Sequence, residues 1–232
     1  MDIINSLKSL IVDYVEKNNL KLILHFPHSS LAVPDSFWKD VDINKDYYNQ
    51  INIKMSDVLL LELFNDWHYD KVIAPYSRLY VDVEKYWDDS KEIMFKYGMG
   101  AIYTKDMYGQ KLHNKKGEFV KEAKEYYDNY HHDLSKICNI NQDVLLLDIH
   151  SFNKEMANIV VMSENYPDLC IGINHDDSCD NDLCEKLKLW CNMNNISYRI
   201  NYPYEGTILP NKRSNKNKIY SIMFEFNKTL YL

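Results

Sequence analysis

The chain has 232 residues, of which 46% are hydrophobic, and a formal net charge of −7 at pH 7. This length suits one domain with a full core, and the acidic balance disfavours nucleic acid as a partner, because phosphate binding requires clustered Lys and Arg. No apolar stretch approaches the roughly 18 residues that cross a bilayer, and the N-terminus does not have the basic and apolar blocks of a signal peptide. We therefore expect a single cytoplasmic domain over residues 1–232 with no membrane partner, and the oligomeric state stays open.

Hydrophobic spacing predicts helices and strands that alternate along the chain. Apolar residues recur every three or four positions in the predicted helices, whereas short apolar runs that end near turn residues predict strands. Ser56 is the candidate N-cap of the second helix. In chain order we expect a helix over residues 3–17, a strand over 22–26, a helix over 57–64, strands over 72–74 and 79–83, a helix over 118–137, strands over 144–149, 158–162 and 170–173, a helix over 182–193 and a strand over 219–226.

Two segments depart from simple alternation. Residues 88–117 are polar and contain four of the six glycines, which predicts a long loop excursion of the kind that often covers a site. Residues 144–149 are apolar except for Asp148, which is typical of a central strand buried on both faces. Strands that alternate with helices favour an α/β layer fold with a mixed sheet.

The cysteines stand at positions 138, 170, 179, 184 and 191 and form no CxxC pair. In a reducing compartment we interpret them as buried or half-buried thiols. A zinc knuckle is the alternative, but the spacings do not fit one.

Polar residues stand at the ends of strands that are otherwise apolar. His28 follows the first predicted strand, His150 follows the strand over residues 144–149, and Glu225 interrupts the last strand. Ligands collect beyond the carboxyl ends of strands in open α/β sheets. Two histidines and a third, oxygen ligand would give Zn²⁺ an open site that lowers the pKa of a water to roughly 7, with Glu225 as general base. Taken singly, each His is more often a hydrogen-bonded turn residue, and the Glu is more often salt-bridged.

Several short blocks of the sequence form a series. They are residues 26–30 (FPHSS), 77–84 (SRLYVDVE), 98–104 (GMGAIYT), 148–152 (DIHSF), 201–207 (NYPYEGT), 223–228 (MFEFNK) and 230–232 (LYL). In this order the series resembles the N-formylglutamate amidohydrolase family, and it covers nearly the whole chain, from about residue 22 to residue 232. Each block is weak alone, but the blocks in order are a specific signal.

The resemblance implies a three-layer α/β/α fold with a mixed central sheet, similar to that of the zinc carboxypeptidases. It also implies a site for zinc, or for another divalent metal, at the sheet edge. His28 and His150 match the two metal-binding histidines. The carboxypeptidase-type third ligand would stand at Leu31, which cannot ligate, so the family's acidic residue before the Ser-Arg block, here Asp57, becomes the third ligand. The alternative for Asp57 is a first-turn residue that stabilises a helix dipole.

The resemblance also assigns roles around the metal. Glu225 matches the catalytic Glu, which takes a proton from water and passes it to the leaving amine. Arg78 matches the Ser-Arg motif and is expected to hold a substrate carboxylate, the alternative being a structural Arg paired with Asp82. Asp82 and Asp148 are expected behind the ligands, where they orient them. The substrate side is also expected to include residues of the tail, namely Asn201, Gly206 and Thr207.

One block departs from the family pattern. The family has Asp-Leu-Asn-Arg where this chain has Asp82, Val83, Glu84 and Lys85. Glu84 adds negative charge where a substrate carboxylate would bind, and Lys85 keeps a cation without the bidentate fork of Arg. We include Lys85 among the substrate-binding residues, and the acyl group and exact substrate stay open.

These observations predict a metal-dependent amidohydrolase that cleaves the C–N amide bond of a small molecule, an N-acyl amino acid such as N-formyl-L-glutamate. The products would then be formate and L-glutamate. The alternatives are a carboxypeptidase or a deacylase of other specificity, a non-catalytic metal-binding module, and a metal-free α/β binding protein. Function has to be argued from the site, because one fold supports many activities.

Overall fold

The computed structural model describes residues 2–39, 41, 43–115, 117–176, 178, 180–213 and 215–232. Contacts within the chain divide it into two compact units. The sheet unit comprises residues 1–26, 59–72 and 134–232, and the loop unit comprises residues 27–58 and 73–133. The expectation of one domain over residues 1–232 therefore stays a prediction.

A single sheet organises the sheet unit. Its strands are β1 (Lys21–Phe26), β2 (Asp70–Ile73), β3 (Val144–Phe152), β4 (Leu169–Gly172), β5 (Tyr198–Ile200) and β6 (Ile219–Asn227). Their order is β2-β1-β3-β6-β4-β5. β1, β3 and β6 run parallel, β4 is antiparallel to β6, and β5 is parallel to β4. The mixed sheet and the α/β class predicted from the sequence are confirmed.

Helices are found in both units. The α-helices are α1 (Asp2–Lys17), α2 (Lys45–Met55), α3 (Leu60–Leu63), α4 (Glu118–Cys138), α5 (Lys154–Val160) and α6 (Asn181–Met193), and the 3-10 helices are η1 (Asp35–Lys39), η2 (Ile93–Tyr97) and η3 (Lys228–Leu230). α2, η1 and η2 belong to the loop unit, α4 begins there and ends in the sheet unit, and the others belong to the sheet unit. None of the described helices is long and apolar enough to cross a membrane.

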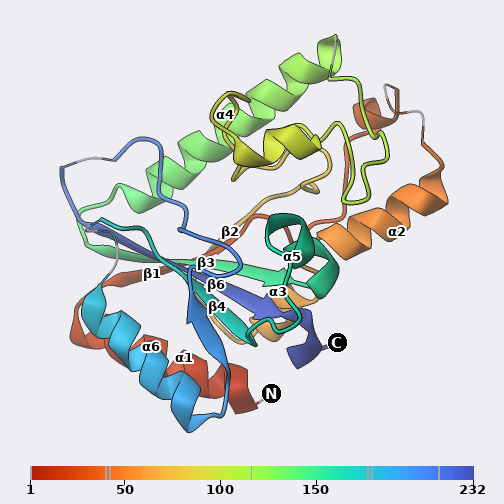
Figure 1. Cartoon of the computed structure of the whole chain (residues 1–232). Helices are drawn as coiled ribbons and strands as arrows, with labels where there is room; N and C mark the ends of the chain where they lie inside the picture. The colour runs from red at the N-terminus through yellow and green to blue at the C-terminus, as the bar shows by residue number, and fades with distance from the viewer. Residues whose placement is uncertain are drawn as a thin grey trace. The chain divides into compact units, whose positions relative to one another are not determined.

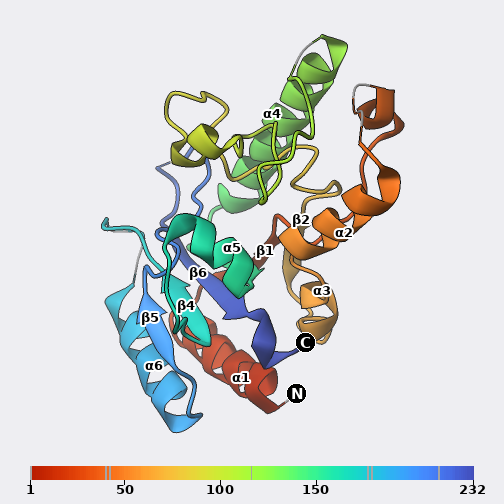
Figure 2. The same cartoon turned by 45° about the vertical axis from the view of Figure 1, so that its right-hand side comes forward.

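One face of the sheet is covered by α1 and α6, which lie side by side in both views (Figures 1 and 2). Successive side chains of a strand alternate between the two faces, and Leu145, Leu147 and Ile149 of β3 share a buried core with residues of these helices. The indole Nε1 of Trp190 donates to Ser6 Oγ at 2.9 Å and joins α6 to α1. This face therefore carries an apolar core.

The opposite face of the sheet carries a second core. Ile23 of β1 and Leu146 of β3 pack with Leu134 and Cys138 at the end of α4. Helices therefore cover both faces, which confirms the predicted three-layer α/β/α arrangement. Because side chains alternate, the residues two and four positions after Leu146 also point to this second face.

The loop unit is held together by aromatic side chains. The ring of Phe37 lies 5.2 Å from that of Tyr48 and 6.1 Å from that of Phe119, and Tyr80 packs against Phe119 at 5.5 Å. Residues 88–115 and 117 lie in the long loop predicted from the glycines, and η2 lies within it. Large rings bury much apolar area for each residue, so a few of them anchor a unit with little regular structure.

The region around Ser56 differs from the prediction. The helix expected over residues 57–64 is reduced to α3, and the longer helix α2 precedes it. Asn44 begins α2, because its side-chain oxygen accepts from two backbone N–H groups of the first turn. Ser56 is the C-cap of α2 and not the N-cap of the next helix.

Two predicted strands are absent from the described residues for a similar reason. Residues 79–83 form a turn and extended chain, because Ser77 Oγ accepts from Leu79 N at 3.0 Å. The strand expected over residues 158–162 is also wrong, because residues 158–160 belong to helix α5, which Asn153 caps with its side chain, and residues 161–162 form no strand. Local side-chain bonds of this kind compete with strand pairing.

Candidate functional site

Polar side chains from three strands line the face of the sheet that carries Leu146. β1 and β3 are paired so that His25 lies opposite Asp148, and β3 and β6 are paired so that His150 lies opposite Glu225. All four polar side chains are buried. Burial of so many polar groups is favourable only when they bond to one another or to a ligand. The pairing register therefore gathers carboxylates and imidazoles at the carboxyl ends of the parallel strands.

Asp148 is the centre of this group. Its Oδ1 accepts from His25 Nδ1 at 2.7 Å and from His150 Nε2 at 2.9 Å, and its Oδ2 accepts from Ile208 N at 3.2 Å. Burial by itself would raise the pKa of the Asp148 carboxyl, but the charges and hydrogen bonds of His150 and His25 hold this pKa well below its usual range. Because an ionised carboxylate can only accept, His150 Nε2 donates to Asp148 Oδ1.

Glu225 lies beside His150 on β6, and its neighbour on the other side is Cys170 of β4. The Cys170 thiol donates to Tyr204 O at 3.3 Å. Burial, together with the Glu225 carboxylate, raises the pKa of Cys170 to about 12, so Cys170 is a neutral neighbour. The described cysteines are free and buried, as predicted, and Cys179 lies outside the described residues; they are Cys138, Cys170, Cys184 and Cys191.

The predicted substrate residues of the tail make contacts within the sheet unit. Asn201 Oδ1 accepts from Gly206 N at 3.2 Å, and Gly206 has a φ of 83°, a conformation that favours glycine. Thr207 Oγ1 lies 2.8 Å from Ser221 Oγ and 3.5 Å from Asp148 Oδ2. The structure therefore places Thr207 beside the Asp148 group, and Asn201 supports the backbone that leads to it.

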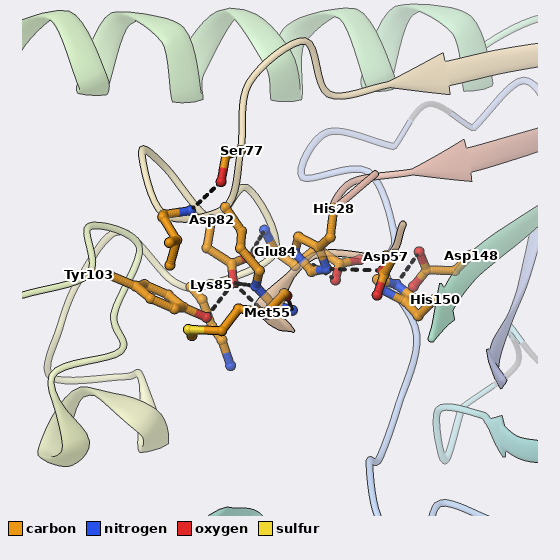
Figure 3. A network of polar contacts seen from close by, with 12 residues as sticks. His28, Met55, Asp57, Ser77, Asp82, Glu84, Lys85, Tyr103, Asp148 and His150 are labelled. Atoms are coloured by element: carbon orange, nitrogen blue, oxygen red, sulfur yellow. Dashed lines mark hydrogen bonds and ion pairs between the residues drawn. The ribbon is translucent and has the colours of Figure 1, made fainter. Parts of the chain in front are cut away.

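His28 is the centre of a second group, in the loop unit (Figure 3). It stands two residues after β1 and is 3% exposed. Its Nε2 lies 2.9 Å from Asp82 Oδ1, and its Nδ1 lies 3.7 Å from Asp57 Oδ2. The backbone N–H of Asp57 donates to His28 O at 2.8 Å, which fixes Asp57 beside the imidazole. Asp57 precedes the N-cap of α3, so the alternative that it stabilises a helix dipole from the first turn is wrong.

Asp82 contacts His28 (Figure 3) and also accepts from Arg78. Its Oδ2 accepts from Arg78 Nη2 at 2.8 Å, from Arg78 Nε at 3.2 Å and from Tyr103 OH at 2.9 Å. Burial by itself would raise the pKa of the Asp82 carboxyl, but the charges of His28 and Arg78 hold this pKa well below its usual range. The ionised carboxylate can only accept, so His28 Nε2 donates to it, and Nδ1 is the ring nitrogen on the side of Asp57.

Both predicted substrate-binding cations of the loop unit have carboxylate partners. Arg78 is paired with Asp82, which is the structural alternative stated for it. Lys85 Nζ lies 3.4 Å from Glu92 Oε1. Glu92 is itself fixed at the start of η2, where its Oε1 accepts from Met94 N at 2.9 Å. Substrate binding by Arg78 and Lys85 therefore stays a prediction.

The two histidines fit a metal ion in their donor chemistry. Each keeps Nε2 on a buried carboxylate, and metal-ligating histidines are commonly held in this way, with the other ring nitrogen as the ligand. The 3.7 Å between His28 Nδ1 and Asp57 Oδ2 is too long for a hydrogen bond. It is close to the about 3.4 Å that separates two ligand atoms of a tetrahedral zinc ion. Imidazole nitrogens and a carboxylate oxygen are ligands that zinc prefers.

The other ring nitrogen of His28 also faces carboxylates. Its Nε2 lies 3.6 Å from Glu84 Oε2, and the ligand atoms of His28, Asp82 and Glu84 lie within 4.8 Å of one another. The Asp82 oxygens already accept from Arg78, Tyr103 and the backbone. Of the two sides of the imidazole, the Nδ1 side with Asp57 is therefore better suited to a cation.

Residues 20–232 match the sequence pattern of the family described as N-formylglutamate amidohydrolase. The chain belongs to the N-formylglutamate amidohydrolase family. It is accordingly a hydrolase that acts on an amide bond, as predicted. Its fold is similar to the crystal structure of N-formylglutamate amidohydrolase from Ralstonia eutropha JMP134, with a TM-score of 0.73 and 18% identity over 92% of this chain and 84% of that chain. No curated protein sequence matches the chain.

Three polar residues of this amidohydrolase were not found from the sequence. His25 lies within the first predicted strand, and its signal was the alternation that puts it on the same face as Ile23. Tyr103 and Glu92 lie in the long loop predicted over residues 88–117. The path of this loop brings Tyr103 to Asp82 and Glu92 to Lys85. Apolar periodicity carries no signal for such contacts.

Proposed function

We propose that this amidohydrolase depends on a metal ion and cleaves the C–N amide bond of an N-acyl amino acid such as N-formyl-L-glutamate, releasing formate and L-glutamate. His28, Asp57 and His150 would bind a divalent ion, with zinc expected, and Glu225 would be the general base. One observation carries the proposal: both histidines bond through Nε2 to a buried carboxylate, and metal-binding histidines held in this way would bind the ion through Nδ1. Family membership supports the amide substrate.

The protein side of the proposed mechanism follows from these positions. A bound divalent ion supplies Lewis acidity to the amide carbonyl and to water. Glu225 would take a proton from the attacking water and pass it to the departing amine, and its register position opposite His150 supports this role. Asp82 and Asp148 would hold the two imidazoles through Nε2, so that Nδ1 can bind the metal ion.

The remaining predicted roles have unequal support. Thr207, which lies beside Asp148, is the tail residue best placed to contact a substrate. Asn201 and Gly206 would shape the loop that presents it. Arg78 and Lys85 are each paired with a carboxylate, which lowers the positive charge that they would offer to a substrate carboxylate.

Metal analysis combined with a hydrolysis screen tests the proposal. Zinc-restored protein is offered N-formyl, N-acetyl and N-succinyl amino acids, and release of the amine is measured. We expect about one equivalent of metal and turnover of at least one series. His28→Ala and His150→Ala should lose the metal, whereas His175→Ala, whose side chain is 78% exposed, should retain it.

Glu225→Gln separates chemistry from metal binding. This variant should keep its metal and lose kcat by about 10²- to 10⁴-fold, while Glu164→Gln, with a side chain 91% exposed, should change neither. A metal-loaded protein that cleaves none of the N-acyl amino acids would contradict the proposal. Cleavage of peptides in their place would favour the carboxypeptidase or deacylase alternative.

A further inference from the structure

His25 is a buried imidazole to which the proposed mechanism gives no role. It lies in β1, and its side chain is fully buried. Because side chains alternate along a strand, it shares a face with Ile23 of the second core, whereas Leu24 and Phe26 pack in the core on the opposite face. An apolar side chain would suit this position, since burial of a polar group is unfavourable without hydrogen bonds. The bonding of His25 therefore indicates why a polar residue stands here.

His25 bonds to the same carboxylate oxygen as His150. His25 Nδ1 donates to Asp148 Oδ1 at 2.7 Å, and His150 Nε2 donates to this oxygen at 2.9 Å. The first bond crosses from β1 to β3, where His25 is the register partner of Asp148. Hydrogen bonds to an ionised carboxylate are roughly twice as strong as bonds between neutral groups. His25 is therefore a strong donor to the oxygen that holds His150.

The bonds of Asp148 fix the plane of its carboxylate. Oδ2 accepts from Ile208 N at 3.2 Å, while Oδ1 accepts from His25. The carboxylate cannot turn about its Cβ–Cγ bond without lengthening one of these two bonds. The place of Oδ1 in turn sets the direction in which Nε2 of His150 points, because hydrogen bonds weaken steeply when they bend. Without His25, Oδ1 would lose the donor that is independent of His150.

We infer that His25 is a positioning residue for His150: it holds Asp148 Oδ1 so that the imidazole of His150 keeps the orientation in which it binds the metal ion. The inference rests on the proposed function, in which His150 is a metal ligand, and adds a residue to it. His25 acts through Asp148 and not by contact with the substrate. Removal of a hydrogen-bond partner behind a metal ligand typically lowers metal affinity by about 10- to 100-fold.

Two variants of His25 separate the hydrogen bond from the rest of the side chain. His25→Ala removes the donor, whereas His25→Asn keeps one, because the amide nitrogen of Asn is attached to Cγ as Nδ1 of His is. Zinc affinity is measured by competition with a chromophoric chelator. We expect His25→Ala to weaken zinc binding about tenfold and His25→Asn to stay within about threefold of the parent protein. Parent-like zinc affinity in His25→Ala, or equal losses in both variants, would overturn the inference.

Ile23→Ala is the matched control for lost packing in β1. Ile23 is as buried as His25 and lies two residues before it, on the same face of the strand. This variant should lower Tm, because it removes buried apolar volume. Its zinc affinity should stay within about twofold of the parent value, because Ile23 has no part in the bonds of Asp148. A loss of affinity as large as that of His25→Ala would overturn the inference, since packing alone would then account for the effect.

A spectroscopic measurement on metal-free protein keeps this inference separate from the proposed function. The Nε2 proton of His150 should give a downfield imidazole N–H resonance, which is assigned by its loss in His150→Ala. We expect this resonance to shift or broaden in His25→Ala and to stay near its parent position in His25→Asn and Ile23→Ala. An unchanged resonance in His25→Ala would overturn the inference. If no N-acyl amino acid is cleaved, the proposed function fails, and this measurement still decides whether His25 positions His150.

Discussion

Replacement of Asp82 by asparagine tests how far the loop unit depends on one buried carboxylate. Asparagine keeps the shape but replaces one acceptor oxygen with an N–H₂ donor. At the Oδ2 position this donor would face the N–H groups of Arg78 at 2.8 and 3.2 Å and the hydroxyl of Tyr103 at 2.9 Å, and at the Oδ1 position it would face the N–H of His28 at 2.9 Å. In either orientation Arg78 loses its counter-charge. Removal of one partner of a buried ion pair costs about 3–5 kcal/mol, and we expect a loss of that size.

The assay is urea and thermal unfolding of chelator-treated protein, so that metal affinity does not contribute. For a chain of this size each kcal/mol corresponds to about 2–4 °C in Tm, so Asp82→Asn should lower Tm by at least about 6 °C. Asp88→Asn is the control, because its side chain is 55% exposed and bonds to Ser90, and its Tm should stay close to that of the parent protein. A loss of less than about 1 kcal/mol for Asp82→Asn would refute the reasoning, since a buried pair cannot be broken so cheaply.

Three further predictions concern packing, pH and the thiols. Gly172→Ala should destabilise the protein by about 1–3 kcal/mol in thermal unfolding, because the added Cβ would lie 2.2 Å from Gly206 O; an unchanged Tm would contradict the tight packing. The pKa values of Asp82 and Asp148 are held below their ordinary 3.8, so their contribution to stability is present above that pH and is lost as pH falls through the lowered values. Circular dichroism during acid titration should show this loss below about pH 4 in chelated protein, and replacing both by Asn should flatten the dependence. Burial raises the pKa of three thiols, those of Cys138, Cys170 and Cys191, to about 12. Intact-mass analysis should therefore find no alkylation of these thiols in the native protein at pH 8. Alkylation of any of the three before unfolding would contradict their burial.

Periodic elements could be predicted from the sequence, whereas elements that begin or end at side-chain caps could not. The helices near residues 3–17 and 118–137 have long apolar stripes, and the structure has them within one or two residues. Residues 79–83 and 158–162 are as apolar as strands. However, the Ser77 hydroxyl accepts from the backbone N–H of Leu79, and the Asn153 side chain caps helix α5, which continues to Val160. A few apolar residues fit either state, so one cap decides the outcome.

The same distinction applies to the candidate site. His150 and Asp148 are two positions apart in a strand, so the alternation of side chains alone puts them on one face, and their bond of 2.9 Å was foreseeable from an Asp-x-His pattern. His28 and Asp82 are 54 residues apart, and their equally short bond depends on a turn that no periodicity predicts. Both pairs nevertheless have the same arrangement, in which a buried carboxylate accepts from Nε2 of the imidazole. Two unrelated local structures therefore reach one arrangement, which supports the proposal that both histidines present Nδ1 to a metal ion.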